Sequence, residues 1–254
     1  MKTYNIDQTL QLLSFKVMKI FDDCKHTQTI DHKENQYRDI VTNLDLIIDS
    51  ELKNSLKKIN PNIIYKSEES DFNLKDFNKI KKLLLVDPLD GSKNIETNLP
   101  FNQTMISYLE KGVVLNSAII NPNNRELLYY SKKLGTSSNK IVQKNNFTGP
   151  VYLAYGSTFS DNQFLTGIIE VINALSAGVY RWGSAGSGLM ELYKGNLKGF
   201  VGKSIKIWDA ISYIPIFEDL ETFIYHKTYE DKLDLIISYD EEIFQELKKY
   251  FHDK

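Results

Sequence analysis

The chain has 254 residues, of which 31 are lysine or arginine and 33 are aspartate or glutamate, giving a formal net charge of −2. Hydrophobic residues make up 42% of the chain and aromatic residues 12%, which is too apolar and too weakly charged for intrinsic disorder. There is no basic surplus to drive binding to DNA or RNA, and the longest purely apolar run, at residues 83–86, is the length of a strand rather than of a membrane span. We therefore expect a folded protein whose partners are neither nucleic acid polymers nor membranes.

The amino-terminal sequence and the cysteine content indicate the compartment. The first residues lead directly into an amphipathic pattern and contain no apolar core of a signal peptide. Cys24 is the single cysteine, which excludes an internal disulfide and a multi-cysteine metal site. These features predict a reduced, cytoplasmic protein.

The chain begins with a pattern typical of two helices. Apolar residues recur at steps of three and four over residues 6–20, which predicts the first helix, and the polar stretch at 25–38 predicts an exposed loop. Thr42 precedes a second apolar face, and Asp45 lies three positions further on, as in a capping box. Asn60-Pro61 is expected to end this helix.

Strands follow the second helix. Residues 63–65 predict a short strand, and the continuous apolar run at 83–86 is typical of a strand that is buried on both faces of a sheet. Between residues 103 and 131 the pattern changes to strands separated by turns, which predicts an antiparallel meander.

The second half of the chain alternates strands and helices. We expect strands at 151–155, 197–201 and 233–237, and helices at 162–175, 208–219 and 241–251. Residues 183–194 are expected to form a small-residue turn that leads into a helix. With a boundary near residues 145–150, the chain divides into an amino-terminal half (1–147) that carries most of the candidate ligands and a carboxy-terminal half (148–254), packed as one compact mixed α/β unit.

Several familiar motifs fail on spacing. Gly202-Lys203-Ser204 ends like a phosphate-binding P-loop, but the first glycine that this motif needs falls on Leu197. The small-residue turn at 183–188 fits neither a nucleophile elbow nor a dinucleotide fingerprint. The four histidines are scattered, so neither a zinc site nor a histidine base is expected. Any chemistry must therefore depend mainly on oxygen ligands.

One hexapeptide combines the groups that suit a cation and a phosphate. Asp87-Pro88-Leu89-Asp90-Gly91-Ser92 follows the buried strand, at the end where open α/β sheets place their ligands. Its two carboxylates can converge on one point with the Leu89 carbonyl, and hard oxygen donors of this kind select Mg²⁺. If Ser92 opens a helix, the free N–H groups offer an anion site. The alternative is that this segment, rich in Asp, Pro and Gly, is simply a turn.

Three other segments fit the same chemistry. Glu68-Glu69 ends the preceding strand, Thr42-Asn43-Leu44-Asp45 opens the second helix, and Trp208-Asp209 lies far downstream. With the hexapeptide they resemble the inositol monophosphatase family of metal-dependent, lithium-sensitive phosphatases, which has an acidic pair, then D-P-[IL]-D-G-[ST], then W-D. The resemblance extends to Gly183-Ser184-Ala185 and Asn121-Pro122, and so covers most of the chain. It implies a layered αβαβα sandwich of the inositol monophosphatase and fructose-1,6-bisphosphatase type, with the site between the halves.

The resemblance implies metal ligands position by position. Glu68, Asp87 and the Leu89 carbonyl would bind a first Mg²⁺. Asp87 would bridge to a second ion, held further by Asp90 and Asp209, with two or three ions in all. Without cations these carboxylates would repel one another.

The resemblance also implies roles towards water and substrate. Ser92 and Asp45 would orient and deprotonate the attacking water, so that the catalytic set would be Asp45, Ser92 and Glu68. The plainer interpretation of Asp45 is a helix cap. Groups that would hold phosphate oxygens or the leaving alcohol are Gly91, Ser92, Ser184 and Ala185.

The chain departs from the family pattern near the substrate. Ser67 replaces the glycine that commonly precedes the acidic pair, and the segment after Trp208-Asp209 differs from the usual A-A-G. The family usually has a carboxylate six positions before the tryptophan, where it accepts hydrogen bonds from ring hydroxyls, but Gly202 stands there. Lys203 follows and is expected to bind a second anionic group of the substrate; the alternative is a solvated loop lysine. Lys93 matches the D-G-T-K run of bisphosphate nucleotidases, or else is a surface lysine.

Together these observations predict a Mg²⁺-dependent phosphomonoesterase. The candidate substrates are a myo-inositol monophosphate or similar sugar phosphate, 3′-phosphoadenosine 5′-phosphate, and fructose 1,6-bisphosphate. The alternative from another class is a non-catalytic descendant that binds a phosphorylated ligand or a partner protein. Family members are often dimers, so a homodimer is the candidate assembly.

Overall fold

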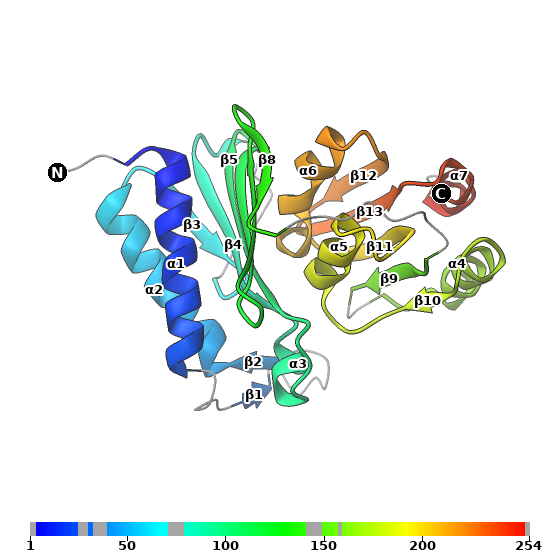
Figure 1. The fold of residues 1–254 in the computed structure, drawn as a ribbon, viewed down its shortest axis with the longest axis horizontal. Helices are drawn as coiled ribbons and strands as arrows, with labels where there is room; N and C mark the ends of the chain where they lie inside the picture. The colour runs from blue at the N-terminus through cyan, green and yellow to red at the C-terminus, as the bar shows by residue number, and fades with distance from the viewer. Residues whose placement is uncertain are drawn as a thin grey trace.

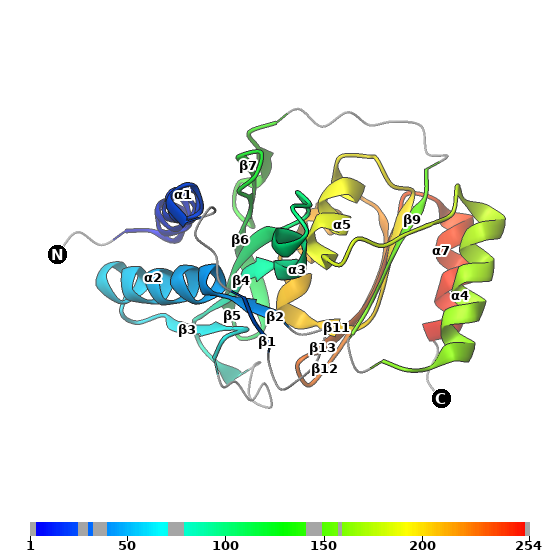
Figure 2. The same cartoon turned by 90° about the horizontal axis from the view of Figure 1, so that it is seen from below.

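The computed structural model describes residues 4–24, 30–32, 40–70, 79–140, 149–156 and 159–251. In these residues helical layers alternate with two sheets, so that the molecule has five layers (Figure 1). Figure 2 shows the two outer helix pairs on opposite sides of the molecule. From the N-terminal side, the helical layers are α1 (Ile6–Cys24) with α2 (Asn43–Ile59), then α5 (Ala185–Tyr193) with α6 (Ile214–Asp219), then α4 (Asn162–Leu175) with α7 (Glu241–Lys248). The expected αβαβα sandwich is therefore confirmed.

The first helical layer forms as its sequence predicts. Thr42 caps α2: its hydroxyl accepts the Asp45 amide, and the Asp45 carboxylate accepts the Thr42 amide at 2.9 Å. This is a complete capping box. On the apolar face of α2, Leu44, Ile48, Leu52 and Leu56 are buried, and the helix ends at Ile59 with Asn60 as its C-cap. Of the exposed loop expected at 25–38, the structure describes only residues 30–32. These form β1 (Ile30–His32), which pairs with β2 (Ile40–Thr42).

The first sheet has six strands in chain order. Its strands are β3 (Ile64–Ser67), β4 (Leu83–Asp90), β5 (Gln103–Glu110), β6 (Val113–Asn121), β7 (Glu126–Ser131) and β8 (Gly135–Ser138). β3 runs parallel to β4, and the remaining pairs are antiparallel. Along β4, Leu84 and Val86 join the core under α1 and α2, whereas Leu83 and Leu85 join the core between the sheets. The prediction of a strand buried on both faces is confirmed.

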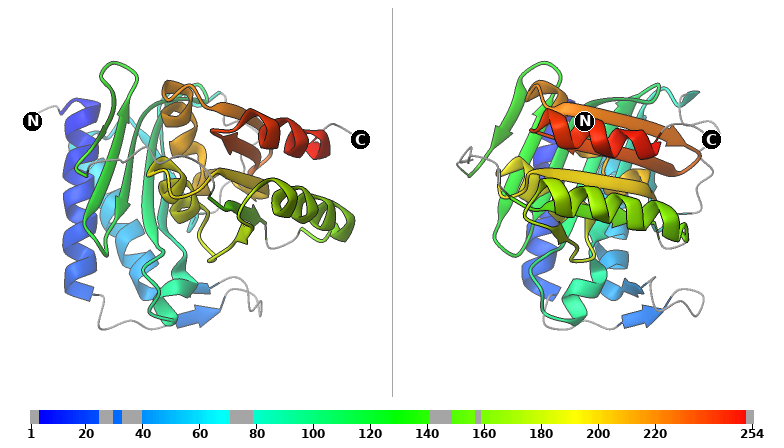
Figure 3. Two further views of the ribbon diagram at one scale, coloured as in Figure 1. Left: turned by 45° about the vertical axis from the view of Figure 1, so that its right-hand side comes forward. Right: turned by 90° about the vertical axis from the view of Figure 1, so that its right-hand side faces the viewer.

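The second sheet has five strands in the order β10-β9-β11-β13-β12. They are β9 (Val151–Tyr155), β10 (Val179–Tyr180), β11 (Gly199–Lys206), β12 (Phe223–Tyr229) and β13 (Lys232–Ser238). Its outer face is covered by α4 and α7, which lie in front of the strands in the right panel of Figure 3. The first sheet uses residues before 139 and the second uses residues after 150, while the expected division at residue 147 lies outside the described residues and stays a prediction.

Several segments differ from the sequence-based expectations. The strand expected at 197–201 is β11, which runs from Gly199 to Lys206, and the short β10 was not expected. Residues 208–219 do not form one helix: two 3₁₀ turns, η3 (Ile207–Asp209) and η4 (Ile211–Tyr213), precede α6, which begins with Pro215 in its first turn. Proline is tolerated at a helix start but not in its interior. β12 was not expected, because it is an edge strand whose middle residues are exposed. No helix among the described ranges is long and apolar enough to cross a membrane.

Candidate functional site

Three carboxylates from separate segments converge at one edge of the first sheet. Because β3 and β4 are parallel, their carboxyl ends meet, and the amide of Glu68 donates to the Val86 carbonyl at 3.1 Å. η3 of the second half brings Asp209 to the same place. One carboxylate oxygen from each of Glu68, Asp87 and Asp209 lies within 4.8 Å of the others. We call this group the acidic cluster.

The acidic cluster is electrostatically strained without a cation. Asp87 is 1% exposed, and burial, followed by the nearby carboxylates of Glu68, Asp90 and Asp209, raises its pKa well above the ordinary value. Burial also raises the pKa of Asp209, with Asp90 and Glu68 as further causes. The Leu89 amide donates to Oδ1 of Asp87 at 3.0 Å, whereas Oδ2 is buried and accepts no hydrogen bond from the described residues.

This orphaned oxygen is a test of whether a metal ion fits. A buried carboxylate oxygen needs a proton, a donor or a cation, and here two further carboxylates lie beside it. The donors are all hard oxygens, the ligand type that Mg²⁺ prefers. The residues present therefore fit a divalent cation of this kind.

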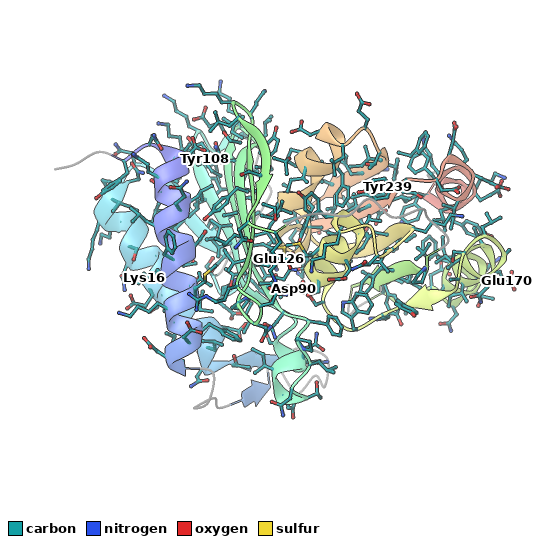
Figure 4. All side chains as sticks on the ribbon, viewed as in Figure 1. Lys16, Asp90, Tyr108, Glu126, Glu170 and Tyr239 are labelled. Carbon is teal, nitrogen blue, oxygen red and sulfur yellow. The ribbon has the colours of Figure 1, made fainter. Side chains whose placement is uncertain are left out.

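Asp90 ends β4 and contacts the start of α5, and Figure 4 shows its position between the two sheets. Its Oδ2 accepts hydrogen bonds from the Ser184 hydroxyl at 2.7 Å and from the Gly186 amide at 2.5 Å. Burial raises the pKa of Asp90 to about 6, although these donors and the amides of Ala185 and Ser187 oppose the rise. The structure thus brings Ser184 and Ala185 to Asp90.

A second carboxylate–hydroxyl pair lies beside the cluster. Ser92 Oγ donates at 2.8 Å to Oδ1 of Asp45, and it is also 2.9 Å from the Leu89 carbonyl. The other oxygen of Asp45 accepts the hydroxyl of Thr42 at 2.5 Å as well as its amide. Asp45 is 2% exposed, so the residue that caps α2 is also held against Ser92. The cap and the catalytic interpretation are compatible with the same geometry.

Gly91 turns the chain from β4 into α3 (Ser92–Glu96). Its φ of +86° is in the region that favours glycine. A Cβ here would lie 2.4 Å from the Phe101 carbonyl oxygen and 2.9 Å from Cβ of Ser184. Asn94 donates to the carbonyls of Phe101 and Trp182, at 2.5 and 2.8 Å, and so ties α3 to both halves.

The structure places Lys203 away from this site. Its ammonium pairs with Asp234 at 2.6 Å and lies 4.9 Å from the centroid of the Phe251 ring, on the outer face of the second sheet. The structure therefore does not support the expected role of Lys203 in binding a second anionic group of the substrate. Gly202 lies on the opposite face, where a Cβ would meet Phe200 at 3.0 Å and Ile205 at 2.9 Å.

Sequence reasoning missed two of the positioning contacts. The Gly186 amide holds Asp90, and a Cβ on Gly186 would lie 2.8 Å from Oδ2 of that carboxylate; the glycine-rich turn was a signal for such a close approach. Tyr152 accepts the amides of Trp182 and Ser184, both at 3.3 Å, and so supports the segment before α5. No local sequence pattern predicts the contact of Tyr152 with this segment.

Comparison with known proteins identifies relatives of the chain. The family described as the inositol monophosphatase family matches residues 3–219. A protein named Nus factor SuhB from Pseudomonas aeruginosa is 25% identical over 199 residues, covering 75% of this chain and 73% of that protein. A fructose-1,6-bisphosphatase/inositol-1-monophosphatase from Thermotoga maritima is 25% identical over 187 residues, covering 74% and 71%. The crystal structure of an IMPase/NADP phosphatase complexed with Mg²⁺ and phosphate has the same fold, with a TM-score of 0.79 at 18% identity over 95% of this chain and 94% of that one.

Proposed function

The chain belongs to the inositol monophosphatase family, and from this premise we propose that it is a Mg²⁺-dependent phosphomonoesterase acting on a small phosphate ester. The observation that carries the proposal is the acidic cluster, with a buried Asp87 oxygen that accepts no hydrogen bond from the described residues. Glu68, Asp87 and the Leu89 carbonyl would hold one ion, and Asp87, Asp90 and Asp209 would hold another. When bound, such ions neutralise the phosphoryl oxygens and stabilise the leaving oxygen.

The remaining residues have roles towards water and phosphate. Ser92 Oγ donates its proton to Asp45, because a carboxylate is the stronger acceptor, and its lone pairs can then accept a proton from the attacking water. As the water oxygen bonds to phosphorus and the ester P–O bond breaks, a water proton moves to Ser92 Oγ and the serine proton moves to Asp45. The leaving oxygen takes up a proton from bulk water. The amides of Gly91 and Ser92 would orient the phosphate oxygens.

The substrate we propose is an inositol or sugar monophosphate or 3′-phosphoadenosine 5′-phosphate. Gly202 supplies no carboxylate to ring hydroxyls, and the side chains of Phe200 and Ile205 fill the space beside it. A site without that acceptor discriminates weakly in favour of a polyol. We therefore expect the bisphosphate nucleotide to compete well with inositol 1-phosphate.

Phosphate release tests the proposal. The full chain is assayed with inositol 1-phosphate, 3′-phosphoadenosine 5′-phosphate and fructose 1,6-bisphosphate, in chelator and after addition of Mg²⁺ or Zn²⁺. We expect no release in chelator, recovery with Mg²⁺ rather than Zn²⁺, and inhibition by lithium. Glu68→Gln should be inactive and Asp240→Asn, at the distant start of α7, active. Full activity in excess chelator would contradict the mechanism.

Binding of a partner protein without catalysis is the second candidate. A relative with the name Nus factor favours it, whereas the complete carboxylate set favours catalysis. The same assay separates the two, because a pure binding protein releases no phosphate from any ester at saturating Mg²⁺. We also propose a homodimer, on the family resemblance, and light scattering of the eluted protein measures its mass.

A further inference from the structure

Two donors at the start of α5 form hydrogen bonds with a single oxygen of Asp90. The hydroxyl of Ser184 and the amide of Gly186 both donate to Oδ2. These donors come from the half that carries the second sheet, whereas Asp90 ends a strand of the first sheet. Asp90 in turn is near enough to the acidic cluster to perturb both Asp87 and Asp209. The contact therefore links α5 to the candidate cation site.

Ser184 has one hydroxyl proton and two acceptors within hydrogen-bond distance. Its Oγ lies 2.7 Å from Oδ2 of Asp90 and 2.8 Å from Oγ of Ser187. A hydrogen bond to a carboxylate is the stronger of the two, so the proton is donated to Asp90. A lone pair of the same Oγ accepts the Ser187 amide at 3.0 Å and caps α5. Ser184 is 1% exposed.

We propose that Ser184 is a positioning residue for the cation site, and that it acts by fixing the orientation of the Asp90 carboxylate through Oδ2. This differs from a role in holding phosphate oxygens or the leaving alcohol, because the hydroxyl proton is already committed to Asp90. The inference rests on the proposed function for the identity of the cation, Mg²⁺. Its test measures metal binding rather than turnover, so the two can fail separately.

Calorimetric titration of the metal-free full chain with Mg²⁺, without substrate, tests the inference. Ser184→Ala should weaken Mg²⁺ binding about 10- to 100-fold, the usual effect of removing a group that orients a metal ligand. In the Asp90→Ala background, which keeps the acidic cluster but has no side-chain oxygen for Ser184 to hold, the same substitution should change the affinity by less than about threefold. Ser184→Gly removes the hydroxyl but keeps a residue tolerated at a helix start, and it replaces Ser184→Ala if that variant does not fold.

A matched control separates positioning from simple loss of a helix cap. Asp161 caps α4 through the Phe164 amide at 2.9 Å, far from Asp90. Asp161→Ala should lower thermal stability about as much as Ser184→Ala while leaving Mg²⁺ affinity unchanged. Wild-type Mg²⁺ affinity in Ser184→Gly would overturn the inference, and so would an equal loss of affinity in the wild-type and Asp90→Ala backgrounds. A wild-type chain that binds Mg²⁺ but hydrolyses no ester would instead refute the proposed function alone.

Discussion

Asp90→Asn should stabilise the metal-free protein at neutral and alkaline pH. The substitution keeps the shape of the side chain and an oxygen that can accept from Ser184 and Gly186, but it removes one negative charge from the junction of the sheets. The carboxylates of Asp87 and Asp209 lie nearby and contribute to the same repulsion. Without this charge, residue 90 should no longer repel the carboxylates of Asp87 and Asp209, while the hydrogen bonds from Ser184 and Gly186 remain.

The magnitude follows from the pKa of Asp90. Burial raises this pKa from the ordinary 3.8 to about 6, so the folded state holds the proton more tightly than the unfolded chain. The contribution of Asp90 to the free energy of unfolding is then fully present below pH about 4 and is lost as the pH rises through about 6. A difference of about 2 in pKa corresponds to about 3 kcal/mol, which for a chain of this size is roughly 5–10 °C in melting temperature.

Thermal melts of the wild type and Asp90→Asn at pH 4, 6 and 8 in chelator measure the effect. The variant should melt higher at pH 8, and the two proteins should converge at pH 4. Saturating Mg²⁺ should raise the melting temperature of the wild type more than that of the variant, because the cation binds only the folded state. Turnover of the variant should fall at least ~100-fold, the scale of losing one preorganised charge.

Asp240→Asn is the control of opposite sign. Partial burial acts to raise the pKa of Asp240, but the Ile243 amide and Lys198 outweigh it and hold the pKa below its ordinary value. Its contribution is therefore present at high pH and lost as the pH falls, so Asp240→Asn should destabilise the protein at pH 8. Equal melting temperatures of wild type and Asp90→Asn at pH 8 in chelator would refute the reasoning about the charge of Asp90.

Three other substitutions test the placement of single residues. Ser92→Ala should lower kcat for phosphate release roughly 100-fold or more, because it breaks the path to Asp45, and wild-type kcat would remove Ser92 from the site. Lys203→Ala should destabilise the protein by roughly 1.5–3 kcal/mol in urea unfolding, since Asp234 loses its cation and keeps only the hydrogen bonds from the Ser204 amide and the Tyr229 hydroxyl. The ratio of kcat/KM between inositol 1-phosphate and 3′-phosphoadenosine 5′-phosphate should not change; a changed ratio with unchanged stability would indicate that Lys203 contacts the substrate. Gly91→Ala should destabilise more than Gly135→Ala, because both have positive φ but a Cβ meets backbone only at Gly91, and equal losses in urea unfolding would contradict the close approach of Phe101.

The elements that the sequence predicts well are those specified by local patterns. The cap of α2 depends on two residues three positions apart, and the burial of β4 on both faces follows from an unbroken apolar run. Lys203 shows the opposite case. Counting back from Trp208 gives its position in the chain but not its face of the sheet, and β11 contains an irregularity between Gly202 and Ile205, with Ser204 at a φ of +52°. A one-residue change in register moves a side chain to the other face.

The candidate site is formed by the packing of the two sheets rather than by either sheet alone. Glu68 follows β3, and Asp87 and Asp90 lie in β4 of the first sheet. Asp209 and the start of α5 belong to the half that carries the second sheet. Without a cation, the carboxylates oppose the docking of the halves, because like charges in a buried site disfavour ionisation. With a cation, the same oxygens bridge the halves, and binding is linked to the docked arrangement. The repulsion that weakens the metal-free junction is thus the property that makes cation binding favour the assembled site.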